Sequence, residues 1–143
     1  MKVLFDTNIV LDVLIDRTPF ADAAVALFAA VEHGALQGYL CGTTVTTVYY
    51  LTAKVLGAKR AHEEVGKLLT LFEVAPIGRP VLESALASDF GDFEDAVVYQ
   101  AACHAGAQAI VTRNLKDFQG AGLPVYSSVE LVKILTVRDR LNK

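Results

Sequence analysis

Five acidic or amide side chains lie after predicted strands or at the start of a predicted helix, at positions where a parallel sheet would gather them. Asp6 comes directly after the apolar run Val3–Phe5, and a crowded acidic stretch, residues 89–95, leads into a predicted helix. Two further groups follow the apolar run Ala109–Thr112. Because ligands bind beyond the carboxyl ends of the strands in open α/β sheets, we expect one shared site made by Asp6, Asp92, Asp95, Asn114 and Asp117.

The chemistry of such a site follows from its charge. Carboxylates that lie close together repel one another, so the arrangement persists most readily with a cation between them. Ligands that are all oxygen favour Mg²⁺ or Mn²⁺ over zinc. Such an ion can orient and activate a water molecule for in-line attack on a phosphodiester. The residues therefore point to metal-assisted hydrolysis of a phosphodiester.

Each of these side chains also has a purely structural interpretation. Asp6 could be only the N-cap of the helix that follows it. Asp92 could cap its own helix, with Asp95 satisfying backbone N–H groups in the first turn. Asn114 could cap a short helical turn, and Asp117 could be a solvated turn residue. Their joint placement after two strands and at one helix start favours a functional site.

Two more carboxylates, Asp12 and Asp16, lie four residues apart on the first predicted helix. We expect Asp16 to face solvent. For Asp12 two interpretations stay open, a solvated position or a supporting position behind the ligands of the site.

Strands and helices that alternate along the chain must position these groups. Apolar runs predict strands at Val3–Phe5, Gln37–Cys41, Ala109–Thr112 and Pro124–Tyr126, and a strand or extended link at Glu73–Ile77. Helical spacing and capping residues predict helices at Asn8–Ile15, Pro19 to about His33, Thr43 or Thr44 to Gly57, Ala58–Phe72, Pro80–Ala87, Phe93–His104 and from Ser127 or Ser128 onward, with a helical turn at Asn114–Phe118. The alternation predicts an α/β fold with a mostly parallel sheet covered on both faces.

The ends of several helices can also be predicted. Thr7 or Asn8 is expected to cap the first helix and Thr18 the second. Glu130 is placed for a capping interaction at the start of the last helix. The charged tail Val137–Lys143 is expected to be loose.

Composition narrows the class of protein. A chain of 143 residues fits a single domain, residues 1–143, and its 53% hydrophobic content excludes disorder. No apolar run approaches the ~20 residues of a membrane span, and no signal peptide is expected. A net charge of −3 gives no overall attraction to nucleic acid, so such a partner needs a local basic patch. Cys41 and Cys103 match no zinc spacing and are expected to be buried free thiols.

Three segments of the sequence resemble a PIN domain. They are Phe5–Asn8 near the N-terminus, Asp92–Ala96 at a helix start and Val111–Phe118 after a late strand, in matching order along nearly the full chain. The resemblance implies a three-layer α/β/α sandwich with a parallel sheet. It also implies a metal-dependent endoribonuclease, most often the VapC-type toxin of a toxin–antitoxin pair.

The resemblance assigns roles to the acidic residues. It implies that Asp6, Asp95 and Asn114 hold Mg²⁺ or Mn²⁺, with Asp117 close by as a further ligand and Asp92 as an accessory acid. In the mechanism that it implies, Asp6 and Asp95 hold the metal, and Asn114 or Asp117 completes or orients its shell. A water molecule, deprotonated with the help of a carboxylate, then attacks phosphorus.

The sequence departs from the family pattern at one position. The family places a glutamate on the helix after the second strand, where this chain has Thr47, and a threonine hydroxyl ligates a hard cation poorly. Glu63 and Glu64 belong to the next helix. Either Asp92, Asp117 or Asp12 supplies the missing charge and the nuclease is active with weaker metal affinity, or the site has decayed into an RNA- or protein-binding module. We favour the active enzyme.

Two other classes of phosphoryl-transfer protein fit less well. A receiver domain needs a phosphoacceptor aspartate at the end of a central strand and a late lysine, and the run Ile110–Thr112 provides neither. A phosphatase with a nucleophilic aspartate has a second aspartate two residues later, and in this chain that position, counted from Asp6, is Asn8.

The implied partners are RNA, an antitoxin protein and a second copy of the chain, in the cytoplasm and away from membranes. Phosphates could be held by two bases beside the proposed site, Arg113 and Lys116. They could also be held by Lys54, which belongs to a basic group with Lys59, Arg60 and Lys67. A solvated charged face is the alternative for these bases. Tyr49 and Tyr50 are expected in the core or a dimer interface rather than stacked on bases.

Overall fold

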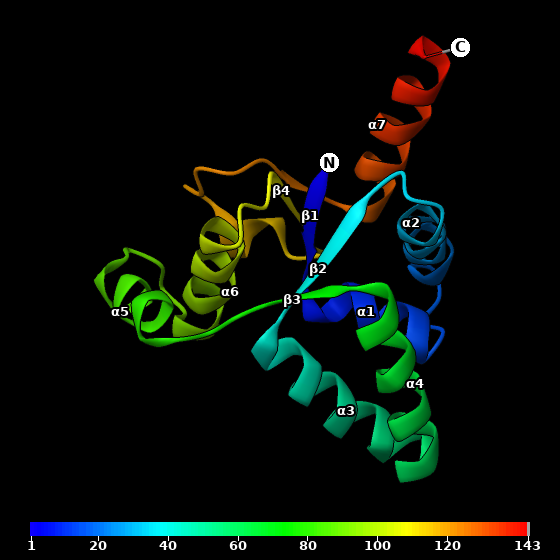
Figure 1. The fold of residues 1–143 in the computed structure, drawn as a ribbon, viewed down its shortest axis with the longest axis horizontal. Helices are drawn as coiled ribbons and strands as arrows, with labels where there is room; N and C mark the ends of the chain where they lie inside the picture. The colour runs from blue at the N-terminus through cyan, green and yellow to red at the C-terminus, as the bar shows by residue number, and fades with distance from the viewer. Residues whose placement is uncertain (143) are drawn as a thin grey trace.

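The computed structural model describes residues 1–142 and has five strands and seven α-helices within that range (Figure 1). The strands are β1 (Lys2–Phe5), β2 (Gln37–Cys41), β3 (Glu73–Ala75), β4 (Ala109–Val111) and β5 (Val125–Tyr126). The helices are α1 (Thr7–Leu14), α2 (Ala21–Glu32), α3 (Gly42–Leu56), α4 (Ala58–Leu71), α5 (Arg79–Ala87), α6 (Phe93–His104) and α7 (Ser128–Leu141), with a short 3₁₀ helix, η1 (Leu115–Phe118). None of these helices is both long and apolar enough to cross a membrane.

The five strands form one parallel sheet in the order β3-β2-β1-β4-β5. β1 lies in the centre, and Phe5 at its end is in register with Leu40 of β2 and Val111 of β4. Because all the strands run the same way, the residues that follow β1 and β4 leave the sheet at the same edge. Asp6 and Thr112 are therefore neighbours although they lie far apart in sequence.

Helices cover both faces of the sheet, which confirms the predicted three-layer α/β/α sandwich. Successive side chains of a strand point to opposite faces. Accordingly Val3 and Phe5 belong to the core beneath α1, α2 and α4, whereas Leu4 belongs to a second core beneath α5 and α6. Figure 1 shows α5 and α6 on one side of the sheet and α1, α2 and α4 on the other. All three of these strand residues are fully buried.

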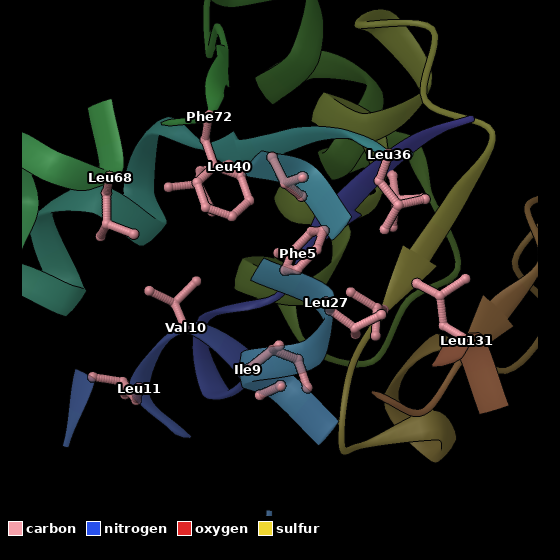
Figure 2. Close-up of a cluster of buried hydrophobic side chains, with 14 of the residues drawn as sticks. Phe5, Ile9, Val10, Leu11, Leu27, Leu36, Leu40, Leu68, Phe72 and Leu131 are labelled. Atoms are coloured by element: carbon pink, nitrogen blue, oxygen red, sulfur yellow. The ribbon is translucent and has the colours of Figure 1, made fainter. Parts of the chain in front are cut away.

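Three aromatic rings anchor β1 just before Asp6. Phe5, Phe28 and Phe72 make mutual edge-to-face contacts with centroids 5.0 to 5.9 Å apart, and Phe5 and Phe72 lie within the apolar cluster of Figure 2. Such contacts stabilise aromatic pairs beyond simple burial. The packing requires Gly38 on β2, where an added Cβ would lie 2.5 Å from the Phe72 ring. The end of β1 is thus held rigidly.

Helix starts were predicted less well than strands. α1 is capped by Asp6, whose side chain accepts a hydrogen bond from the Thr7 N–H, and not by Thr7 or Asn8. α2 begins only at Ala21, and no side chain caps it, so the predicted Thr18 cap is wrong. α3 follows Cys41 directly, without a side-chain cap. α2 and α3 are thus held by packing and not by capping side chains, whereas α1 has the Asp6 cap that the structural interpretation of this residue offered.

The last helix shows one confirmed and one incorrect expectation. Ser127 and Glu130 form the predicted reciprocal capping box at the start of α7. The tail expected to be loose from Val137 is helical as far as Leu141, because Arg138 and Arg140 lie in the last turn, where positive charge stabilises the helix dipole. Lys143 lies outside the described residues. Of the two cysteines, Cys41 is buried as predicted, but Cys103 is exposed.

Candidate metal centre

Asp6 is held in place by three hydrogen bonds at the end of β1. Its N–H donates to the Val111 carbonyl at 3.0 Å, its Oδ2 accepts from the Thr112 hydroxyl at 2.8 Å, and its Oδ1 accepts from the Thr7 N–H at 2.8 Å. The carboxylate therefore has a fixed orientation. Burial raises the pKa of Asp6, the bonds from Thr112 and Thr7 oppose that shift, and Asp117 adds to it.

A pocket of about 350 Å³ opens beside Asp6. The structure brings all five predicted side chains to its wall, which is lined by Asp6, Thr7, Asn8, Leu11, Arg17, Asp92, Glu94, Asp95, Val98, Asn114 and Asp117. Five of these residues are acidic and one, Arg17, is basic. We call this the acidic pocket.

Asp95, in the first turn of α6, lies close to the other acidic side chains of the pocket. Its pKa is raised to about 6, first by partial burial and then by the neighbouring charges of Asp92, Asp117, Asp6 and Glu94. Asp92 is the N-cap of α6 and its Oδ1 accepts from the Asp95 N–H at 2.9 Å. The capping interpretation of Asp92 is therefore correct, and the same side chain also lines the pocket.

Thr112 connects the two strand ends of the site, and sequence reasoning missed it. The buried Thr112 hydroxyl donates to Asp6 and accepts from the Asn114 N–H at 3.0 Å. The Asn114 side chain makes no capping bond to η1, so the capping interpretation is wrong, and it lines the pocket. Asp117 is an exposed residue of η1 that also lines the pocket. The position of this threonine directly after the strand was visible in the sequence, but its residue type alone did not distinguish it from other β-branched residues.

The donor set suits a hard divalent cation, since the oxygen-bearing side chains are five carboxylates, two amides and one hydroxyl, and no histidine or cysteine is among the described residues that line the pocket. Among the described residues, no group of three or more His, Cys, Asp or Glu side chains is arranged to hold a metal ion. Mg²⁺ is commonly bound through one or two carboxylates with several waters retained. The pocket fits that mode of binding better than a closed cage of protein ligands.

Asp12 does not contribute to the acidic pocket. It is fully buried on α1, and its carboxylate pairs with the guanidinium groups of Arg17 at 3.0 Å and Arg113 at 3.3 Å. The suggestion that Asp12 supplies the missing charge is therefore wrong, because two cations already use that charge. Asp16 is exposed, as expected.

Thr47 is not among the described residues that line the acidic pocket. It is half-buried on α3, one helical turn after Thr44, whose hydroxyl lies 2.9 Å from that of Thr7 in the pocket wall. Glu64 on α4 pairs with Arg60 and Lys67. It is thus occupied elsewhere, in agreement with the expectation that the α4 glutamates are misplaced.

The basic residues predicted to contact RNA have different environments. The Arg113 guanidinium stacks on the Phe20 ring, 4.0 Å from its centroid, in addition to pairing with Asp12. Lys116 is exposed and lines a hollow shared with Asn114 and Asp117. Lys54 lies over the Tyr50 ring on α3 and is not in the wall of the acidic pocket.

Comparison with known proteins agrees with this geometry. Residues 2–116 match the family described as PIN domain. The chain is 26% identical over 137 residues to "Ribonuclease VapC1" of Aquifex aeolicus, covering 90% of this chain and 92% of that protein.

Solved structures of similar fold come from several bacteria. A "Toxin-antitoxin complex from Klebsiella pneumoniae" matches with a TM-score of 0.68 and 25% identity, over 88% of this chain and 97% of that one. A DNA-bound VapBC of Salmonella typhimurium matches with a TM-score of 0.67 at 17% identity, over 90% and 98% of the two chains, which shows likeness of fold alone.

Proposed function

This chain belongs to the PIN domain family, and from that premise we propose that it is a divalent-metal-dependent endoribonuclease, the toxin of a toxin–antitoxin pair. One observation carries the proposal. Five carboxylates line one pocket at the strand ends, and its one arginine pairs with Asp12, which lies outside the pocket. The Aquifex relative named as a ribonuclease supports the activity.

The roles of the residues follow from their positions. In this proposal Asp6 and Asp95 hold Mg²⁺ or Mn²⁺, and Asn114 and Asp117 complete or orient its surroundings. The bound cation would supply Lewis-acid stabilisation of charge on the phosphoryl oxygens and lower the pKa of water. Asp6 is kept in one orientation by Thr112 and Thr7, so it needs no rearrangement before it binds.

The remaining carboxylates take part in moving the proton. A water molecule attacks phosphorus in line with the leaving oxygen, so that one P–O bond forms while the P–O bond to the leaving oxygen breaks, and the leaving oxygen takes a proton from solvent. Asp92 or Asp117, whichever is not on the cation, accepts the proton of the attacking water. Asp92 is already fixed because its Oδ1 accepts from the Asp95 N–H, so this accessory carboxylate has a constant position from which to accept the proton.

Cleavage of a labelled RNA with and without Mn²⁺ tests the proposal. Asp6→Asn should lower cleavage by at least about 10³-fold, because several kcal/mol of charge stabilisation are lost with the cation, and should leave the circular dichroism spectrum unchanged. Asp16→Asn is the matched control, since it removes an equal charge from an exposed turn near the same helix. Full activity in Asp6→Asn would refute the assignment.

A second candidate, a weakened or inactive PIN scaffold that binds RNA or protein, is favoured by two observations. Thr47 stands where the family has a glutamate and is not in the pocket wall, and no three acidic side chains among the described residues form a ready metal site. Calorimetric titration with Mn²⁺ separates the candidates. A dissociation constant well below the millimolar range supports the nuclease, whereas a millimolar dissociation constant or no binding supports the scaffold.

We also propose the partners that such a toxin would have. They are an RNA substrate, an antitoxin and a second copy of this chain, with residues 1–143 acting as one domain in the cytoplasm. The Klebsiella complex supports the antitoxin, and the exposed Tyr49 and Tyr50 on α3 offer apolar surface for a homodimer. Arg113, Lys116 and Lys54 remain proposed contacts for the RNA backbone.

A further inference from the structure

Arg17 is the one base among the residues that line the acidic pocket. A guanidinium beside five carboxylates would ordinarily pair with one of them. Instead its Nε donates to Asp12, at 3.0 Å, and its Nη2 donates to the Asn8 carbonyl, also at 3.0 Å. Asp12 lies outside the pocket wall and is fully buried. Arg17 is therefore paired with a carboxylate outside the pocket wall, and the part of the chain that the structure describes shows no ion pair between a base and a pocket carboxylate.

The turn after α1 is built to hold this contact. Asp16 adopts a left-handed backbone conformation with φ of 48°, which aspartate tolerates better than most residues. The Arg17 N–H then donates to the Asp12 carbonyl at 3.1 Å. Backbone and side chain of Arg17 thus both bond to Asp12. An arginine fixed at three points loses little side-chain entropy when it binds an anion.

The charges around Asp12 do not cancel. Asp12 pairs with both Arg17 and Arg113, so the three side chains together carry a charge of +1. Within the described residues, Nη1 of Arg17 has no bonding partner, and the side chain is one-third exposed. An N–H donor of a positively charged group is thus free at the rim of a pocket that otherwise repels anions.

We infer that Arg17, held by Asp12, binds a backbone phosphate of the substrate beside the acidic pocket. The inference rests on the proposed function. A phosphodiester approaching several carboxylates needs a cation that does not neutralise them. Arg17 meets that need because its Nε pairs with Asp12, outside the pocket wall, and its Nη1 has no partner among the described residues. Asp12 is then a positioning residue, which acts on the substrate only through Arg17.

Steady-state cleavage of a labelled single-stranded RNA at several KCl concentrations, with Mn²⁺, tests the inference. Arg17→Gln should raise KM by about 10-fold and leave kcat within about two-fold, because a contact to a non-reacting phosphate contributes uniform binding. The slope of log(kcat/KM) against log[KCl] should fall in magnitude by about 0.7, the value for one lost contact to a single strand. Arg17→Lys should recover part of both effects.

Matched measurements separate this role from simple damage to the fold. Arg79→Gln removes an exposed arginine that pairs with Glu83 on α5, and it should change neither KM nor the slope. In Arg17→Gln the Mn²⁺ affinity measured by calorimetry should be unchanged or tighter, because a competing cation has been removed. A disrupted pocket would instead bind Mn²⁺ more weakly, which would overturn the inference.

Failure of the inference is distinct from failure of the proposed function. If the unaltered protein cleaves RNA and Arg17→Gln keeps its KM and its salt slope, Arg17 binds no phosphate although the nuclease assignment stands. If the unaltered protein has no Mn²⁺-dependent cleavage, the proposed function fails. In that case, binding of the same RNA measured by anisotropy must still lose about 0.7 of its salt slope in Arg17→Gln, or the inference fails too.

Discussion

Two aspartates six residues apart in the same segment, Asp6 and Asp12, have opposite environments. Asp6 is held by a hydroxyl and an amide, which carry no charge, and lies in a pocket with other carboxylates. Asp12 is paired with two arginines. Burial raises the pKa of Asp6, because hydrogen bonds alone do not offset the loss of solvent.

Lack of charge compensation, and not burial alone, therefore distinguishes Asp6, the carboxylate that we propose binds the metal, from Asp12. An aspartate paired with two cations stabilises the structure around it, and it has no charge left with which to bind a metal. An aspartate oriented by neutral donors keeps its full charge for a ligand. The uncompensated charge of Asp6 therefore lowers the free energy of unfolding of the protein, and this decrease can be measured.

The largest stability effect is expected at Asp12. Asp12→Asn would leave Arg17 and Arg113 without their shared carboxylate, and removing one partner of a buried ion pair costs about 3 kcal/mol. Asp6→Asn should lose no stability in the absence of metal, because it removes an uncompensated charge. Urea denaturation of both variants measures the two effects. An Asp12→Asn protein as stable as the unaltered chain would contradict the comparison.

A second prediction concerns a substitution that adds a carboxylate near the acidic pocket instead of removing one. Thr47→Glu should tighten Mn²⁺ binding by about 10-fold, or ~1.4 kcal/mol, since an added carboxylate raises the charge available to the cation. Thr47 lies one turn after Thr44, which contacts Thr7 in the pocket wall, so a longer side chain there extends from the helix face nearest the pocket.

Thr46→Glu is the matched control for that substitution. It adds the same charge at an exposed position on α3, and residues two apart from Thr44 do not share its face of the helix. Calorimetry should therefore show Mn²⁺ affinity close to that of the unaltered chain. Equal tightening in both variants would mean that general charge, and not position, determines the affinity.

The comparison also explains what could be predicted from the sequence. An aspartate after the apolar run Val3–Phe5 marks a strand end, and parallel strands bring their ends together, so the fold and the meeting of Asp6 with Asp95 and Asn114 could be anticipated. The pairing of Asp12 with Arg17 and Arg113 could not, because it depends on a left-handed turn at Asp16 and on the path of the loop after β4, which carries Arg113.

Helix ends were harder to predict for a related reason. Capping residues indicate a helix start only when local hydrogen bonds decide it, as at Ser127 and Glu130. α2 and α3 begin where packing against the sheet allows, without a side-chain cap. Thr112, which links Asp6 to Asn114, was missed because a buried threonine at a strand end looks like any other β-branched residue.

The smallest effect is expected at Asp95, whose carboxylate lies among the other acidic side chains of the pocket. Its pKa is raised from 3.8 to about 6, so between these values the folded chain binds more protons than the unfolded chain, and stability falls as pH rises. Without metal, the free energy of unfolding of Asp95→Asn should exceed that of the unaltered chain by about 1 kcal/mol at pH 8, a figure reduced for solvent screening. Near pH 3.5 the two free energies should be equal. Asp22→Asn, exposed on α2, serves as the control in urea denaturation at both pH values.

Saturating Mn²⁺ should make the unaltered chain more stable than Asp95→Asn at pH 8, because only the unaltered chain gains the binding free energy of the cation in full. A variant no more stable than the unaltered chain at pH 8 would show that the acidic pocket carries no uncompensated charge.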